Sequence, residues 1–170
     1  MKLIKATALL AAIGIMAFLS IHQPRLPSDS VIDRIVVLKS KRQLLVYQQD
    51  ELLKTYKISL GRNPIGTKQF QGDKKTPEGK YYINDKNPNS QFHKNLGISY
   101  PDQQDIEFAK SLNKDPGGDI KIHGLRNGLG FISKLHRLVD WTNGCIAVTN
   151  FEIDEIFNHT SIGIPIEINE

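Results

Sequence analysis

IKIHGLRNGLGFISKLHRLVDWTNGCIAVTNFEIDEIF, residues 120–157, contains the chain's only cysteine, its only tryptophan and two of its five histidines. The letters IKI before His123 alternate between apolar and polar residues and predict a short strand that ends in a loop. TNGCIAV, residues 142–148, predicts a turn that leads into another strand or into the start of a helix. The thiol of Cys145 and the imidazole of His123 are therefore both expected where the backbone bends.

Cys145 is a candidate nucleophile. A thiol with an ordinary pKa of about 8.5 is only a few per cent ionised at neutral pH, so a catalytic cysteine needs a neighbouring base or cation. His123 and His136 are the candidate bases, and His123 is favoured because a strand can hold its ring at the roughly 3 Å distance that proton transfer needs. The alternative is that the lone cysteine is a small buried hydrophobe. Export to an oxidising compartment, argued below, makes an unpaired thiol without a function less expected.

At these residues the sequence resembles the YkuD-type L,D-transpeptidase catalytic domain, whose pattern is His-Gly upstream of Ser/Thr-His-Gly-Cys-Ile/Val-Arg. The resemblance extends to KRQLLVYQQDELLKTYKISLG (41–61) and KTPEGKYYI (75–83), and it covers about residues 32–168. It implies a mainly β fold, a YkuD-like β-sandwich of mixed sheets with one or two short helices and a long active-site loop. It also implies that Cys145 is the nucleophile and His123 the general base.

Three features depart from the family pattern. Asn143 stands where the family usually has a second histidine, Ala147 stands where it usually has arginine, and His123 precedes Cys145 by 22 residues, which is more than usual. Other residues are therefore expected to contact the substrate, including its carboxylate: Arg126, Arg137, His136, Asn143 and Thr142. Backbone N–H groups of Gly144 and Cys145 are expected to form an oxyanion hole, since glycine allows a close backbone approach.

The resemblance implies a reaction on peptidoglycan stem peptides, in which the carbonyl of a diamino acid is attacked and a thioester forms on Cys145. The thioester would then pass to an amine acceptor, a peptide or a wall-linked protein, or to water, as in an L,D-carboxypeptidase or amidase. No cofactor or metal is expected. Two further alternatives are a metal-dependent hydrolase that uses His93, His123, His136 and Cys145, and a wall-binding module without catalysis.

The net charge of +4 is modest, and no basic run is interleaved with aromatic residues, so nucleic acid is not expected as a partner. Lys2 and Lys5 precede an apolar segment, residues 6–21, that would span roughly 24 Å as a helix, less than a hydrocarbon core of roughly 30 Å. Residues 1–22 are therefore predicted to be a signal peptide or an N-terminal membrane anchor, followed by a linker at 23–31. The protein is expected to be exported to the periplasm or cell envelope, or anchored in the inner membrane, with membrane contact only through this segment.

Residues 32–170 are expected to form one catalytic domain. Short segments rich in β-branched and aromatic residues predict strands at 32–38, 43–48, 53–60, 80–84 and 163–168. Pro165 suggests that the last of them is an edge strand. Residues 61–79 are expected to be a long functional loop or a disordered surface excursion, and 85–119 to be loop with a short helix and an optional strand at 96–101. A capped helix is predicted from Thr149 or Asn150 to His159, and His93 is expected to be exposed.

Overall fold

The computed structural model describes Gly14 and residues 24–170. Apart from Gly14, the predicted signal peptide or anchor lies outside the described residues, as does the first linker residue. Its role stays a prediction. Within the described part of the chain, no helix is long and apolar enough to cross a membrane.

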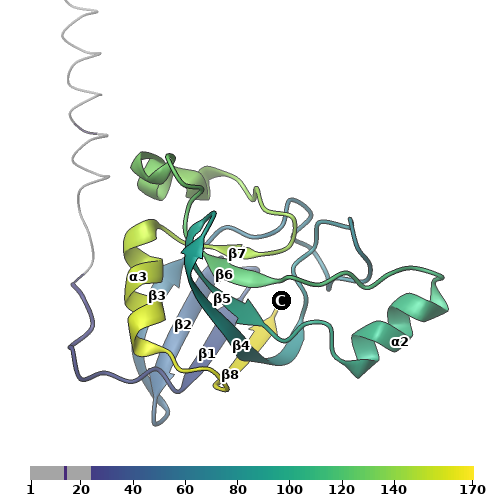
Figure 1. The fold of residues 1–170 in the computed structure, drawn as a ribbon, viewed down its shortest axis with the longest axis horizontal. Coiled ribbons are helices and arrows are strands. Elements are labelled where there is room, and N and C mark those ends of the chain that lie inside the picture. The colour runs from purple at the N-terminus through teal and green to yellow at the C-terminus, as the bar shows by residue number, and fades with distance from the viewer. Residues whose placement is uncertain (1–13, 15–23) are drawn as a thin grey trace, which may run out of the picture.

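The domain is built on one curled, mixed sheet of eight strands in the order β3-β2-β1-β8-β4-β5-β6-β7 (Figure 1). The strands are β1 (Arg34–Leu38), β2 (Gln43–Gln48), β3 (Glu51–Lys57), β4 (Gly79–Ser90), β5 (His93–Ile98), β6 (Lys121–His123), β7 (Ile146–Ala147) and β8 (Pro165–Asn169). The β1–β8 and β6–β7 pairs are parallel, and the other pairs are antiparallel. The predicted mainly β fold is confirmed.

The long strand β4 connects the two halves of the sheet. Its first residues pair with β8 and its later ones with β5, with an irregular register near Ile83. The curl also brings the two ends of the strand order together, because Ser59 and Ala147 exchange backbone hydrogen bonds of 2.9 and 2.8 Å. This closure places β7, and Cys145 immediately before it, beside the chain that leaves β3.

Apolar side chains inside the curl form one core. Alternate residues of β1 and β2 are buried, as the period of two in a strand requires. Helix α3 (Asn150–His159) covers this core with Ile153 and Ile156. It begins as predicted at Thr149, whose side chain accepts from the backbone N–H of Glu152 while the Glu152 side chain accepts from the backbone N–H of Thr149.

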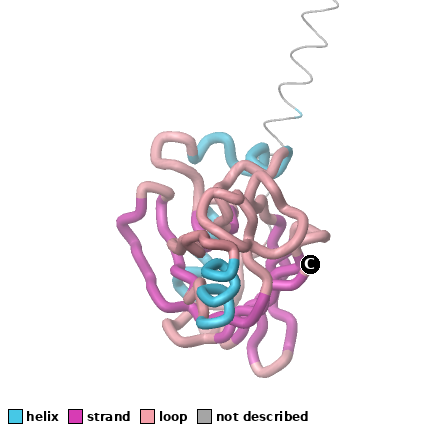
Figure 2. Tube along the Cα trace, turned by 90° about the vertical axis from the view of Figure 1, so that its right-hand side faces the viewer, coloured by secondary structure: helices cyan, strands magenta, loops and turns pink. Residues whose placement is uncertain are grey.

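Two further helical segments lie outside the sheet. Helix α2 (Gln103–Ser111) is capped by Asp102 and lies on the opposite side of the sheet from α3 (Figure 1). It stands in front of the strands in the view of Figure 2. The 3-10 segment η1 (Gly130–Leu138) occupies the chain between β6 and β7 and is kinked at Ser133, where φ is 46°. This segment lies within the 22-residue stretch from His123 to Cys145.

Three expectations are wrong. Strand β8 is not at an edge but lies between β1 and β4, which is possible because Pro165 is its first residue, where the missing N–H costs least. Residues 85–98 are not mainly loop, because β4 continues to Ser90 and forms a hairpin with β5. His93 is half-buried at the start of β5, where its Nε2 lies 2.9 Å from Asp154 Oδ1.

The loop between β3 and β4 is ordered by hydrogen bonds rather than disordered. The Asp73 carboxylate accepts from the backbone N–H groups of Gln69, Phe70 and Lys75. It also pairs with the buried Lys68 at 2.9 Å. At the base of the loop, the fully buried Lys39 ammonium donates to the Gly66 carbonyl at 2.8 Å and to Glu78 at 2.5 Å. The predicted long loop therefore has a fixed shape.

Candidate active site

A cleft of about 660 Å³ opens where β6 ends and β7 begins. His123 and Cys145 both line it, so the structure brings together the base and nucleophile expected from the sequence. The remaining lining residues come mainly from the β4–β5 turn, the segment before β6 and the turn before Cys145: Arg62, Asn87, Asn89, Ser90, Gln91, Phe92, Asn95, Gly118, Asp119, Ile120, Lys121, Trp141, Thr142 and Asn143.

The sheet register explains why thiol and imidazole share this cleft. In the parallel pair β6–β7, His123 is opposite Ala147 and Ile122 is opposite Ile146. Cys145 precedes Ile146 by one residue, so its side chain falls on the same face as that of His123, two residues along the register. Ile122 and Ile146 point the other way and are fully buried in the core.

The Cys145 thiol is neutral at rest. Its Sγ donates to the Asp119 carbonyl at a distance of 3.6 Å. Burial raises the pKa of the thiol, and this outweighs the backbone hydrogen bond from Lys121, which lowers it. The site therefore does not hold a preformed thiolate, and ionisation of Cys145 requires a base that removes the proton during the reaction.

His123 has the tautomer of a base aimed at the cleft. Its Nδ1 lies 2.6 Å from the Gly124 carbonyl oxygen, which can only accept, so Nδ1 carries the hydrogen and Nε2 carries the lone pair. Burial lowers the pKa of His123, as does the nearby Lys121, although the hydrogen bond to Gly124 opposes this shift. A neutral imidazole at neutral pH is the form that can accept a proton from Cys145.

Aromatic rings fix the orientation of His123. The Phe92 ring centroid lies 4.7 Å from that of His123, and the Trp141 centroid lies 5.7 Å away in an edge-on arrangement. Trp141 also stacks on Phe92 at 6.2 Å. Neither ring is assigned a role from the sequence. Phe92 comes from the β4–β5 turn and becomes a neighbour of His123 only when the sheet has formed.

Thr142 shapes the turn before the nucleophile. Its hydroxyl donates to the Cys145 carbonyl at 2.7 Å and accepts from the Gly144 N–H at 3.1 Å. Gly144 has a φ of 130°, and a Cβ there would lie 2.6 Å from the Lys75 carbonyl oxygen, so only glycine fits. The Gly144 N–H is thus engaged by Thr142, and it must exchange this acceptor before it can bind an oxyanion.

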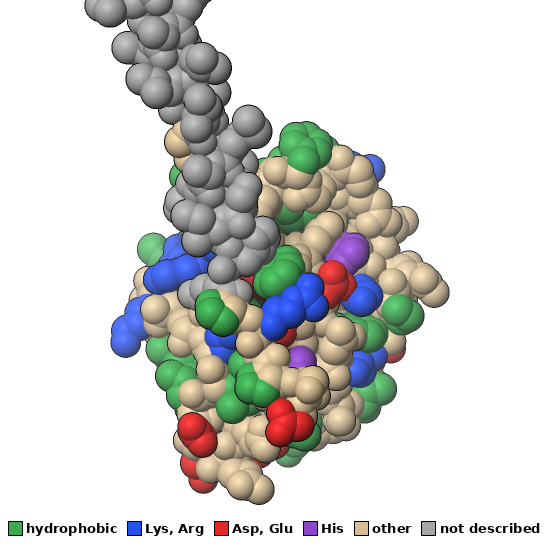
Figure 3. All heavy atoms as spheres, turned by 90° about the vertical axis from the view of Figure 1, so that its left-hand side faces the viewer, with side chains coloured by type: hydrophobic (Ala, Val, Ile, Leu, Met, Phe, Trp, Pro, Cys, Tyr) green, Lys and Arg blue, Asp and Glu red, His purple; other side chains and the backbone are tan. Residues whose placement is uncertain are grey.

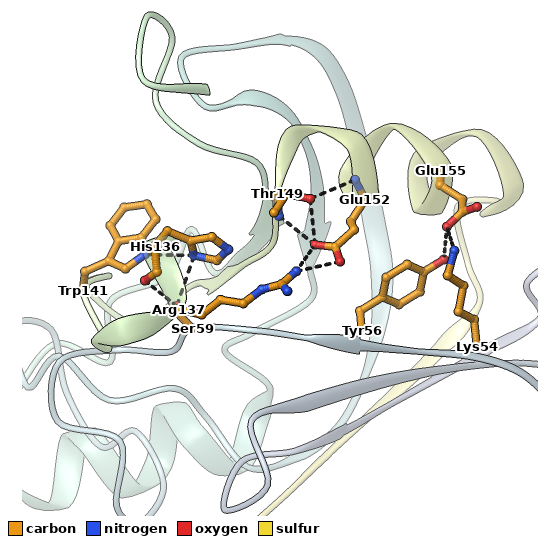
Figure 4. A network of polar contacts seen from close by, with 9 residues as sticks. All are labelled: Lys54, Tyr56, Ser59, His136, Arg137, Trp141, Thr149, Glu152 and Glu155. Carbon is orange, nitrogen blue, oxygen red and sulfur yellow. Dashed lines mark hydrogen bonds and ion pairs between the residues drawn. The ribbon is translucent and has the colours of Figure 1, made fainter. Parts of the chain in front are cut away.

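His136 lies behind the cleft rather than in it. It is only 7% exposed, and its Nδ1 is 3.1 Å from Ser59 Oγ and 3.4 Å from Trp141 Nε1 (Figure 4). Burial lowers its pKa to about 3, with smaller contributions from Arg137 and His123. His136 is therefore neutral, and it contacts Trp141, which lines the cleft.

The two arginines expected to meet a substrate carboxylate do not line the cleft. Arg137 donates to both carboxylate oxygens of Glu152 on α3 (Figure 4). Arg126 is exposed in the turn that leads to η1. Arg62, in the loop after β3, is exposed and lines the cleft, and no described residue pairs with its guanidinium. No local signal in the sequence distinguishes Arg62 from a surface arginine.

Asn143 is exposed and lines the cleft, at the position where the family pattern has histidine. It is one of five amide side chains in the lining, with Asn87, Asn89, Gln91 and Asn95. The Asn95 side-chain oxygen is buried and has no hydrogen-bond partner among the described residues. Among those residues, no group of three or more histidine, cysteine, aspartate or glutamate side chains could hold a metal ion.

The family model for the L,D-transpeptidase catalytic domain, YkuD, matches residues 32–168. The chain is 33% identical over 129 residues to the "Putative L,D-transpeptidase YafK" of Escherichia coli K12, across 72% of this chain and 45% of the relative. It thus spans about half the length of the curated relatives that it matches.

Solved structures agree with the family match. The helical cell shape determining protein Pgp2 from Campylobacter jejuni has a TM-score of 0.62 and 25% identity, covering 84% of this chain and 49% of Pgp2. L,D-transpeptidase 1 from Mycobacterium tuberculosis has a TM-score of 0.50 at 16% identity, covering 81% of this chain and 60% of that one. The second likeness is one of fold alone.

Proposed function

Because the chain belongs to the L,D-transpeptidase catalytic domain (YkuD) family, we propose that it is a cysteine-dependent acyl transferase that acts on peptidoglycan stem peptides through a thioester on Cys145. The observation that carries the proposal is the pairing of β6 with β7, which puts a neutral thiol and a neutral imidazole on one cleft face. Hydrolysis of the same peptides, as by an L,D-carboxypeptidase or amidase, is the second candidate. The open cleft favours it, because water can reach the thioester there.

In the first step, Nε2 of His123 takes the thiol proton while Sγ of Cys145 attacks the carbonyl at the L-configured centre of the diamino acid. The tetrahedral intermediate then collapses, and the amide C–N bond breaks. His123 returns the proton to the leaving amine, and the terminal D-residue departs. The acyl group remains on sulfur as a thioester.

In the second step, an amine attacks the thioester and gives a proton to His123. The C–S bond breaks, and sulfur recovers the proton as a thiol. The product is a new amide, which is a cross-link when the amine belongs to a second stem peptide and an attachment when it belongs to a wall-linked protein. With water as the acceptor, the same sequence gives a free carboxylate.

The negative oxygen of each intermediate needs hydrogen-bond donors, and one such donor typically contributes on the order of 3 kcal/mol. We assign this role to the backbone N–H groups of Gly144 and Cys145. Since Gly144 N–H is bound to Thr142 Oγ1 at rest, the donor becomes available when the turn adjusts to the substrate. Thr142 is thereby a positioning residue for the oxyanion hole.

The remaining lining supports a peptide substrate with a carboxylate. Five amide side chains offer both donors and acceptors to peptide groups. The exposed guanidinium of Arg62 can bind a carboxylate in two places, and takes over the part that Ala147 cannot perform. Export to the periplasm or cell envelope, as the N-terminal sequence predicts, would bring this cleft to its substrate.

The test is mass spectrometry of purified muropeptides with tetrapeptide stems, before and after incubation with the protein. A transferase produces cross-linked dimers, or an exchanged terminal residue when a free D-amino acid is supplied. A hydrolase produces tripeptides, with one ¹⁸O incorporated from labelled water. Unchanged muropeptides would reject both reactions, provided that circular dichroism shows a folded protein and alkylation shows an accessible Cys145 thiol.

A further inference from the structure

The segment from Leu129 to Val139 buries a polar side chain and exposes apolar ones, the reverse of the usual arrangement in a folded domain. Its polar residue His136 is buried, whereas its apolar side chains face outward. Phe131, Leu138 and Val139 are 76, 79 and 65% exposed. We call the exposed apolar residues of this segment the outer patch: Leu129, Phe131, Leu135, Leu138 and Val139. Figure 3 shows hydrophobic side chains standing out at the top of the domain, the height at which η1 lies in Figure 1.

The outer patch is held in place and is not a loop that could fold its apolar residues inward. His136 contacts Ser59, two residues beyond the end of β3, and the backbone carbonyl of His136 accepts from the Ser59 hydroxyl at 3.0 Å. Arg137 is bound to Glu152 on α3. These contacts fasten the inner side of η1 to the sheet and to α3 (Figure 4), and they keep the apolar side chains in solvent. Contiguous exposed apolar residues of this kind mark an interaction surface.

Arg25, near the start of the described domain, lies beside the N-terminal end of α3, the end that binds η1 through Glu152. The guanidinium of Arg25 stacks over Phe151 at 4.4 Å, and Phe151 immediately precedes Glu152, the residue that holds η1. The Pro24 carbonyl accepts from Lys54 at 2.6 Å, which fixes the chain here. Only His22 and Gln23 lie between the apolar segment 6–21 and Pro24. The three Cα-to-Cα steps from residue 21 to Pro24 can span at most about 10 Å. A bilayer that holds residues 6–21 is therefore close to this face.

We propose that residues 6–21 remain as a membrane anchor and that the outer patch rests in the interfacial layer of the lipid bilayer that holds them. Exposed Phe and Leu side chains beside basic residues are the composition of surfaces that bind to this layer. Arg25 and Arg126 are both exposed, one at the start of the domain and one in the turn before η1, where they can meet anionic headgroups. The inference concerns a face outside the catalytic cleft and does not depend on the reaction.

The test uses the full chain with Cys145→Ala, so that a single introduced cysteine can carry an environment-sensitive fluorophore. The label is placed by Leu138→Cys in the outer patch. The matched control is Ile162→Cys, because Ile162 is 60% exposed and lies beyond the other end of α3. Both proteins are reconstituted into vesicles of phosphatidylcholine and phosphatidylglycerol with brominated acyl chains.

We expect brominated lipid to quench the label at position 138 by about twofold or more and to leave the label at position 162 unquenched. Phe131→Ser with Val139→Ser should reduce the quenching at 138 while the circular dichroism spectrum stays unchanged. Equal, weak quenching at both positions would overturn the proposal. Shielding of the 138 label that depends on protein density and not on brominated lipid would also overturn it, in favour of a second copy of the chain.

Discussion

Two buried histidines pack edge-on against Trp141 but differ in their place relative to the cleft, which only His123 lines. The ring centroids of His123 and His136 are 5.7 and 6.4 Å from that of Trp141. His123 ends a strand, lines the cleft and has one nitrogen tied to a backbone carbonyl. His136 lies within η1, and its ring contacts Ser59. The comparison teaches that a place in the cleft lining, rather than distance along the sequence from Cys145, separates a candidate base from a supporting residue.

The largest effect is expected from removing the Cys145 thiol, the group that His123 is proposed to deprotonate. Cys145→Ala should abolish turnover, because it removes the sulfur on which the thioester would form. Cys145→Ser should also be inactive, since a hydroxyl is a far weaker nucleophile than a thiolate. Muropeptide conversion measures both, and circular dichroism checks that the fold is retained. Turnover close to wild type in Cys145→Ala would refute the thioester mechanism.

The second prediction compares alanine substitutions of the two histidines. His123→Ala should lower kcat/KM by about 10²- to 10⁴-fold, the usual effect of losing a general base, and should slow Cys145 alkylation at pH 7. His136→Ala should change the alkylation rate little. Because burial lowers the pKa of His123, the wild-type acid limb of kcat/KM should lie below the ordinary histidine pKa. Slower alkylation in His136→Ala than in His123→Ala would assign the base to His136.

The third prediction compares Arg62, which lines the cleft, with Arg137 and Arg126, which do not. Arg62→Ala should raise KM about tenfold or more, because a charged hydrogen bond contributes roughly 1.5–3 kcal/mol. Arg137→Ala should leave KM unchanged and lower Tm, since Arg137 binds Glu152 and lies outside the cleft. Arg126→Ala is the surface control. A KM increase in Arg126→Ala or Arg137→Ala, with none in Arg62→Ala, would restore the assignment made from the sequence.

The smallest effect at neutral pH should come from His136→Gln, whose consequence is acid stability. The folded pKa of His136 is lowered to about 3, so below its ordinary pKa the unfolded chain binds a proton that the folded protein does not. This histidine should therefore make the free energy of unfolding fall by about 1.4 kcal/mol per pH unit as the pH drops from about 6.5 towards 3. Above pH 6.5 it has no such effect.

Urea titrations at pH 7, 6 and 5 measure this slope. The difference between wild type and His136→Gln isolates the contribution of His136 from that of the carboxylates, which titrate in both proteins. Equal slopes in the two proteins would mean that His136 takes up its proton in the folded state.

Local features of the sequence predicted local structure well. The α3 cap depends on Thr149 and Glu152, which are three residues apart, so the sequence contains the whole interaction. The strands β1 and β2 follow from a period of two within one segment. That Cys145 and His123 line one cleft was also predictable, because each lies next to a recognisable element and the family pattern contains both.

The rest depended on contacts between distant segments. The place of β8 in the middle of the sheet is set by β1 and β4, which Pro165 does not reveal. Arg62 and Phe92 reach the cleft only through the curl of the sheet. The polarity of η1 is reversed because His136 has a partner in the chain just after β3 and Arg137 has one on α3. A pattern of apolar residues alone therefore cannot tell which side of η1 faces inward.

The group that orients His123 is a main-chain carbonyl, that of Gly124. A substitution can replace any side chain but cannot remove this main-chain oxygen. The hydrogen bond that sets the tautomer of His123 is therefore kept in most single substitutions. The exception is a mutation that shifts the backbone itself. A Cβ at position 124 would lie 2.8 Å from Asn150 Oδ1. A substitution of Gly124 can therefore shift the backbone and move the carbonyl that orients His123.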